Sequence, residues 1–245
     1  MKKTIVKLLT LSIMLTLGLT GCTYTEEVVE KDETTIRLED NYETGQTGVT
    51  DKIDIDGESF QLICQYDTGD YPLNKWRVTD SKIINMTVTT TELPEGYSVY
   101  VQHVHADISL KSTEPQIDGI TQDTMDDSDH RVPSNGFFIN DTYSYNNAFA
   151  IEGYTDQFYT LWGYAFSSYG SLSSSYERLT EYNIRKVGTY AEKLSVVYDI
   201  VIITPDCKEG YVKSVYSQVL IPLTSEIKIV EKDLWTGEII EDATE

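Results

Sequence analysis

Apolar side chains recur at every second position through much of this chain, which is the pattern of half-buried β-strands. In residues 83–88, Ile84, Met86 and Val88 alternate with Ile83, Asn85 and Thr87. In residues 100–110, one face is expected to carry Tyr100, Gln102, Val104, Ala106, Ile108 and Leu110. Residues 195–203 are apolar on both faces, as in a central strand.

Turn and cap residues separate these segments. Leu93-Pro94-Glu95-Gly96 predicts a turn, because proline presets one backbone angle and glycine relieves strain. We therefore expect residues 82–110 to form a β-hairpin. One short helix is predicted near residues 181–187, with Thr180 as its cap, Glu181 at its positive end and Gly188 at its stop.

Further strands are predicted at residues 158–166, 211–223 and 226–230. About nine to eleven short strands with one small helix indicate a mainly β protein. The fold class we expect is an antiparallel β-sandwich, Ig-like or jelly-roll-like, with that single helix.

The amino terminus has the composition of an export signal. Lys2, Lys3 and Lys7 precede an apolar stretch of about a dozen residues, which is shorter than the ~20 residues of a membrane-spanning helix. The tetrapeptide that follows, Leu19-Thr20-Gly21-Cys22, resembles the bacterial lipobox. This resemblance implies cleavage before Cys22 and acylation of its thiol, so Cys22 is the expected membrane anchor. Two acyl chains give stable attachment, where one would be marginal.

Composition divides the rest of the chain. Residues 22–50 hold eight carboxylates against Lys31 and Arg37, so we expect a solvated, disordered tether. Residues 51–232 are expected to form a single domain, followed by an acidic tail at 233–245. Loss of residues 1–21 would remove three lysines and change the formal charge from −21 to −24, which argues against nucleic acid as a partner.

Three internal stretches, LPEGYSVYVQHVHADISLKS, DGITQDTMDD and KLSVVYDIVI, resemble surface lipoproteins of Gram-positive bacteria, some of them encoded on mobile elements. They span most of residues 80–203. The resemblance implies an extracellular location, lipid-anchored on the cell membrane, and it implies no catalytic residue.

Histidines and acidic residues form the first candidate site. His103, His105 and Asp107 project from one face of a strand, and imidazole with carboxylate can bind a divalent transition ion such as zinc. His130 could complete the set. The alternative is a solvent-facing strand with ordinary polar residues. The acidic stretch Asp118 to Asp129 offers oxygen ligands for calcium but lacks the spacing of an EF-hand, and it equally fits a charged loop.

Tyrosines form the second candidate site. Residues 143–176 combine tyrosine with serine, glycine and asparagine, a composition typical of adaptable binding surfaces. The tyrosines nearest to loops are Tyr143, Tyr145, Tyr154, Tyr169 and Tyr176. We expect them to form a surface for an unknown protein or a cell-wall glycan.

Cys64 and Cys207 are the other two cysteines. An extracellular location permits a disulfide between them, while Cys64 equally fits a buried small hydrophobic residue in a strand. No motif for hydrolysis, phosphate binding or dinucleotide binding occurs. The sequence therefore favours a lipid-anchored, non-enzymatic binding protein, with a metal-binding protein built on His103, His105 and Asp107 as the alternative.

Overall fold

The computed structural model describes the backbone of residues 23–31, 42–128, 136–153, 155, 158, 180–186, 188–233 and 239–242. Side chains are described for the same residues except those of 23–31, 225–233 and 239–242. The predicted signal peptide and Cys22 lie outside the described residues.

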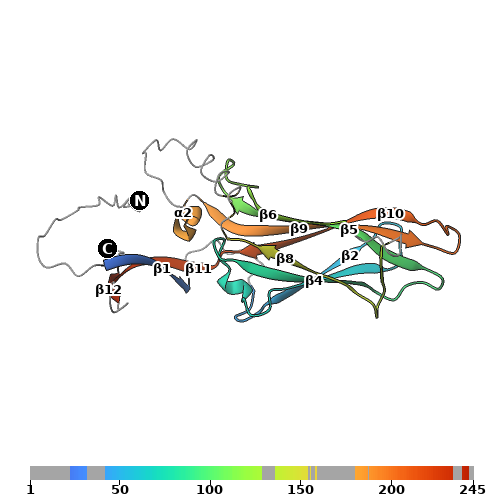
Figure 1. Ribbon diagram of the computed structural model, residues 1–245, viewed down its shortest axis with the longest axis horizontal. Coiled ribbons are helices and arrows are strands. Elements are labelled where there is room, and N and C mark those ends of the chain that lie inside the picture. The colour runs from blue at the N-terminus through green and yellow to red at the C-terminus, as the bar shows by residue number, and fades with distance from the viewer. Residues whose placement is uncertain are drawn as a thin grey trace, which may run out of the picture. The chain divides into compact units, whose positions relative to one another are not determined.

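The main unit is an antiparallel β-sandwich, as predicted from the alternating pattern (Figure 1). One sheet has the strand order β2-β3-β4-β8, and the other has the order β10-β9-β5-β6, with β7 paired to β5. The first sheet comprises β2 (Gly48–Asp54), β3 (Gln61–Asp67), β4 (Lys82–Thr90) and β8 (Tyr145–Ile151). The second comprises β5 (Ser98–Ser112), β6 (Thr121–Asp127), β7 (Phe137–Ile139), β9 (Thr189–Ile203) and β10 (Tyr211–Pro222). A 3-10 turn (Leu73–Lys75) and the helix α2 (Glu181–Lys186) complete this unit.

The core lies between the two sheets and follows the alternation read from the sequence. Leu62, Cys64 and Tyr66 of β3 are buried, and so are Ile84 and Met86 of β4. Their polar neighbours in sequence point away from the core, because successive side chains of a strand point to opposite faces.

Polar contacts also join the two sheets through the interior and along both edges. The hydroxyl groups of Tyr66 and Tyr198 lie 3.0 Å apart in the buried core. At one edge, Ser217 of β10 donates to Asp51 of β2 at 2.7 Å. At the other edge, Asn147 of β8 donates to Asp127 of β6 at 2.6 Å.

The helix and its caps agree with the prediction. Thr180 accepts a hydrogen bond from the backbone of Asn183 at 3.2 Å, which satisfies one of the free amides of the first turn. Gly188 has a φ of 88°, the left-handed conformation that ends a helix.

The predicted hairpin at residues 82–110 is wrong in its pairing. Pro94 and Tyr97 close the expected turn with a backbone hydrogen bond of 3.1 Å. The strands on either side of this turn, β4 and β5, belong to different sheets. Each buries one face in the common core, so the turn connects the two layers of the sandwich and does not join neighbours within one sheet.

The expected face of β5 is also wrong in its first part, because the strand contains a β-bulge. Val101 pairs with Ile200 and His103 pairs with Asp199, so Gln102 is an extra residue without its own partner. Val99 and Val101 therefore point inward before the bulge, and Val104, Ala106 and Ile108 point inward after it. Gln102 itself is exposed.

The segment expected to be a disordered tether and the acidic tail, for which the sequence predicted no structure either way, both contain strands. Within the predicted tether lies β1 (Thr23–Lys31), and within the predicted tail lies β12 (Ile239–Asp242). With β11 (Ser225–Asp233) they make a three-stranded sheet of order β1-β11-β12. The β-branched residues of TYTEEVV favour extended backbone, and this preference opposes the disorder that the charge of the segment predicts. The expected domain boundaries stay a prediction.

Residues of the predicted strand at 158–166 lie outside the described part of the chain except Phe158. That residue is buried and has helical backbone conformation.

The bulge makes a testable prediction. Deleting Gln102 should leave a regular strand in which Val101 and Val104 still point inward, so the midpoint of thermal unfolding should fall only slightly. Deleting Asp107 should turn Ile108 and Leu110 outward, at a cost of about 3–6 kcal/mol from two large side chains. Thermal and urea unfolding followed by circular dichroism compares the two deletions. Equal losses of stability would contradict the assigned register.

Candidate functional site

The outer face of the five-stranded sheet carries an unusual row of apolar side chains. In the register of the sheet, Val212 of β10 pairs with Val201 of β9. Val201 pairs with Tyr100 of β5, and Tyr100 pairs with Phe138 of β7. Directly paired residues of an antiparallel sheet project from the same face, so these four side chains form a continuous row across four strands. Four strands span roughly 14 Å from first to last.

Ring contacts extend this row at one end. The Tyr100 and Phe138 rings lie 5.5 Å apart between centroids, and Phe138 lies 5.9 Å from Tyr143 in the loop before β8. On β10, Tyr216 pairs with Val197 on the same outer face. We call this surface the aromatic face, and it consists of Tyr100, Phe138, Tyr143, Val197, Val201, Val212 and Tyr216.

Three members of the aromatic face are unusually exposed for their size. Tyr216 is 64% exposed, Tyr143 is 62% exposed and Val212 is 57% exposed. Scattered exposed apolar residues are normal on any protein, but these lie on one face and beside partly buried rings. The alternation in YVKSVYSQVL showed that Val212 and Tyr216 share a face of β10, but it did not show that this face points to solvent.

A chain of hydrogen bonds crosses the aromatic face between the row that contains Val212 and the pair of Tyr216 and Val197. Ser214 of β10 donates to Asp199 of β9 at 2.6 Å. His103 of β5 contacts Asp199 through Nδ1 at 2.9 Å and Asp126 of β6 through Nε2 at 2.5 Å. With a carboxylate at each ring nitrogen, the imidazole is best satisfied as the cation, which donates from both nitrogens.

The pKa values of these groups reflect their mutual contacts. Hydrogen bonds with Asp199 and then Asp126 raise the pKa of His103. The hydrogen bond with His103 is the largest cause of the lowered pKa of Asp126. Burial opposes ionisation of Asp199, but the hydrogen bonds from Ser214 and His103 outweigh it and lower the pKa of that carboxyl.

The structure brings only part of the predicted metal site together. His105 Nδ1 lies 3.7 Å from Asp126, so His103 and His105 share a carboxylate. Burial raises the pKa of Asp107, with Lys193 and His105 opposing it. Across the described residues, no group of three or more His, Cys, Asp and Glu side chains could hold a metal ion. His130 lies outside the described residues, so the four-residue site stays a prediction.

The acidic stretch proposed for calcium is a strand and not a loop over most of its length. Residues 121–127 form β6, and their carboxylates contact protein groups. Asp127 accepts from the Tyr145 hydroxyl at 2.6 Å, and Asp123 accepts from the Glu152 backbone at 3.0 Å. In the turn before β6, Asp118 pairs with Lys111 at 2.6 Å. Asp129 lies outside the described residues.

Two of the five tyrosines predicted to form a binding surface lie in the described part of the chain, and one is exposed while the other is buried. Tyr143 is exposed, as expected, and belongs to the aromatic face. Tyr145 is only 2% exposed, because residue 145 begins β8 on its inward face. Tyr154, Tyr169 and Tyr176 lie outside the described residues.

A buried polar cluster lies at one end of the sandwich core. Glu192 of β9 accepts a hydrogen bond from the Trp76 indole at 2.5 Å, and the Lys82 ammonium lies 4.4 Å from the centre of the same indole ring. Glu181 of α2 pairs with Arg185 at 2.9 Å. The cluster thus joins residues from both sheets and from the helix.

Ionisation of Glu192 and Lys82 is opposed by burial. Burial raises the pKa of Glu192 to about 7, and the Lys82 charge and the Trp76 hydrogen bond limit the rise. Burial likewise lowers the pKa of Lys82 against the attraction of Glu192 and Glu181. The second carboxyl oxygen of Glu192 is buried without a hydrogen-bond partner, which penalises its charged form.

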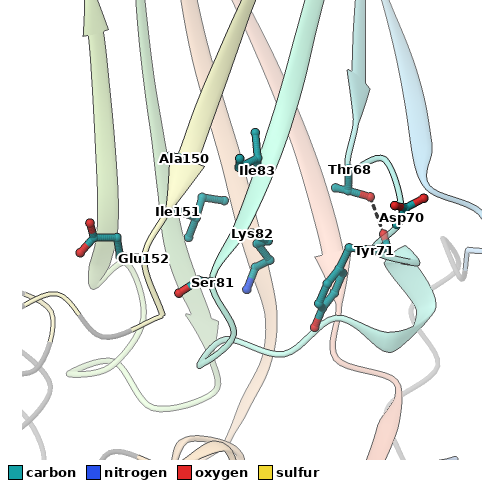
Figure 2. A pocket seen from close by; sticks show the side chains of 9 residues that line it. All are labelled: Thr68, Asp70, Tyr71, Ser81, Lys82, Ile83, Ala150, Ile151 and Glu152. Carbon is teal, nitrogen blue, oxygen red and sulfur yellow. Dashed lines mark hydrogen bonds between the residues drawn. The ribbon is translucent and has the colours of Figure 1, made fainter.

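An open pocket of about 600 Å³ lies beside this cluster. Figure 2 shows Lys82 and Ser81 near Tyr71, with Ile83 and Ile151 further along the neighbouring strands. The Lys82 ammonium is bound to the backbone oxygens of Arg77 and Asp80, so it is not available to a ligand. We therefore read the cluster as structural and assign no reaction to the pocket.

Cys64 and Cys207 are both free in the structure, and they do not form the disulfide that their location would permit. Cys64 lies in the core, where burial and then the charge of Asp51 raise its pKa to about 12. Cys207 is half-buried in the turn between β9 and β10.

Comparison with known proteins does not add a function. No family model matches the chain, and no curated protein matches it in sequence. A solved protein from Archaeoglobus fulgidus covers 72% of this chain and 95% of its own, at 8% identity and a TM-score of 0.28. Similarity at that level carries no argument about either fold or activity. In the part of the chain that the structure describes, no helix is long and apolar enough to span a bilayer.

The cysteines give the first prediction of this section. A thiol reagent applied to the native protein should modify Cys207 and leave Cys64 unmodified, because burial and a raised pKa keep Cys64 protonated and inaccessible. Peptide mapping by mass spectrometry separates the two sites, and Cys207→Ser is the control. Modification of Cys64 at the same rate, or of neither cysteine, would contradict the described core.

The His103 contacts predict a pH-dependent contribution to stability. Because the folded pKa of His103 is raised, its contribution is complete below about pH 6.5 and is lost as the pH rises through the folded value. Because the pKa values of Asp126 and Asp199 are lowered, both carboxylates stay charged as the pH falls, and the contribution of His103 to stability persists down to about pH 4. The difference in unfolding free energy between wild type and His103→Asn should therefore be largest between these limits.

Urea unfolding at a series of pH values measures this difference. The matched control is Asp199→Asn, alone and combined with His103→Asn, since residues in direct contact give non-additive effects. A difference that does not change from pH 5 to pH 9 would contradict a cationic His103.

Proposed function

We propose that this chain is a lipid-anchored, non-enzymatic protein on the outer side of the cell membrane, and that it binds a macromolecular partner on the aromatic face. The observation that carries the proposal is the exposure of Tyr216 and Val212 on one face of the five-stranded sheet, together with the exposure of Tyr143, whose ring contacts Phe138 of that sheet.

An apolar surface of this kind is costly unless a partner covers it. Full burial of one large apolar side chain contributes about 1.5–3 kcal/mol of stabilisation, which an exposed side chain does not provide. Tyrosine combines a large contact area with few rotatable bonds, which is the reason for its enrichment in binding surfaces. The partly buried ring of Phe138 makes tilted contacts with Tyr100 and with the exposed ring of Tyr143, and these contacts hold Tyr143 in place.

The anchoring part of the proposal rests on the sequence. Lys2, Lys3 and Lys7, the apolar stretch and Leu19-Thr20-Gly21-Cys22 together resemble a lipoprotein signal. A diacylated Cys22 would keep the sandwich at the membrane surface and leave its outer sheet face available to proteins or polymers of the envelope. The separate resemblance of the three internal stretches to surface lipoproteins favours a Gram-positive cell.

Metal binding remains the alternative, but no observation favours it. Both ring nitrogens of His103 already contact carboxylates, and this arrangement favours a protonated imidazole that cannot bind a metal ion.

The anchor can be tested by replacing Cys22. Wild-type protein expressed in a Gram-positive host should partition into the detergent phase and incorporate labelled palmitate, because acyl chains add about 0.8 kcal/mol per buried CH₂. Cys22→Ser should lose both properties. A Thr20→Ser variant keeps a small residue in the lipobox and is the matched control. Detergent partition retained by Cys22→Ser would rule out the lipid anchor.

The binding face can be tested on intact cells by amine-reactive cross-linking. Wild-type protein should give a cross-linked species of higher mass that is lost in the double variant Tyr216→Ser, Val212→Ser. Ile83 is 53% exposed on the other sheet, so Ile83→Ser is the matched control and should keep the species. Loss in both variants, or in neither, would rule out this face as the binding surface.

A further inference from the structure

We infer that the partner held on the aromatic face is a protein segment that combines lysine or arginine with apolar side chains. This inference rests on the proposed function and specifies the chemistry of its ligand. It is drawn from the charges that border the aromatic face and from the kinds of apolar group within it.

The charges on the outer sheet face are unevenly distributed. In the paired register, carboxylates occur at the aromatic end, where Asp199 and Asp126 lie beside His103. Lys193 pairs with Ser109, at the opposite end of the same strands. Asp141 is also exposed, two residues from Tyr143. Lys193 has Asp107 and Asp118 as electrostatic neighbours, so the far end of the face carries no net positive charge. A basic partner is therefore attracted to the aromatic end.

Asp126 provides a specific acceptor for such a partner. Its side chain is 60% exposed, and its contacts with His103 and His105 both use Oδ1. Among the described residues, no contact engages Oδ2 of Asp126. That oxygen can accept from an ammonium or guanidinium group while the contact with His103 stays intact.

The exposed rings favour the same ligand. A lysine or arginine cation over the face of Tyr216 or Tyr143 is attracted by the π-electrons of the ring. The formal charge of the whole chain, −21, adds a long-range field that speeds the approach of a basic protein and slows that of an anionic polymer. Nucleic acid is excluded by the same field.

The aliphatic residues favour a protein over a glycan. Val212 is 57% exposed at the end of the row, whereas its neighbour Val201 is only 6% exposed and supports it from beneath the surface. A sugar ring stacks on aromatic faces, whereas a valine surface best buries the aliphatic side chains of another protein. Tyr100 and Phe138 then extend a surface on which basic and apolar side chains can alternate.

The inference can be tested by selection from a displayed library of short random peptides on the full chain in detergent, with counter-selection on Tyr216→Ser, Val212→Ser. Recovered peptides should carry net positive charge and apolar residues. The best of them, made synthetically, should bind Tyr216→Ser about tenfold more weakly in calorimetry, as expected for loss of 1.4 kcal/mol. Asp126→Asn should weaken binding and reduce its dependence on salt.

Matched controls separate a specific site from general attraction to an acidic protein. Ile83→Ser and Tyr182→Ser remove exposed apolar groups elsewhere and should bind as wild type does. Equal binding to wild type and Tyr216→Ser would mean non-specific charge attraction and would overturn the inference.

Other outcomes would also overturn the inference, and they differ in whether the proposed function survives. Recovery of neutral or acidic peptides that depend on Tyr216 would keep the binding face and reject a basic partner. If no peptide depends on Tyr216, soluble cell-wall glycans are tested on the same variants. Glycan binding that is lost in Tyr216→Ser would keep the proposed function and replace its partner, and no binding of either class would reject both.

Discussion

The long pairing of β5 with β9, which shifts register at Gln102 and again between Lys111 and Ser112, is the constraint on which the rest of the structure depends. It lets Val99 and Val101 point into the core on one side of the bulge, and Val104 and Ala106 on the other. As a result Tyr100 and His103 both face outward in successive rows of the sheet. In a regular strand without a bulge, residues 100 and 103 would lie on opposite faces, so His103 would point away from the row that contains Tyr100.

Polar contacts inside the sandwich add specificity to a core that hydrophobic burial already stabilises. The Tyr66–Tyr198 pair and the Trp76–Glu192 contact each link the two layers, and each requires one relative position of the sheets. A buried carboxyl group beside a buried lysine is costly, and it is tolerated because the Trp76 indole contacts both and because Glu192 is readily protonated. Removal of one member would leave the other buried and uncompensated.

The outer face of the five-stranded sheet combines two features that single strands do not show. The Ser214–Asp199–His103–Asp126 chain ties three strands together with charge-assisted hydrogen bonds. Beside it, apolar groups from four strands form one surface. The hydrogen-bond chain fixes the strands that carry the apolar groups, and a surface that is ordered before binding loses less entropy when a partner binds.

The sequence by itself determined β4, β5, β9 and β10 as strands, the helix with its caps, and the common face of His103 and His105, because alternation and capping act over a few neighbouring residues. It also supplied the only argument for the anchor at Cys22. Only the tertiary structure decided that β4 and β5 lie in different sheets, that His103 lies between two carboxylates, and that Tyr216 is exposed while Tyr145 is buried. These outcomes depend on which strands pair across long stretches of sequence, and alternation within one strand carries no information about its neighbour or about which of its faces meets the core.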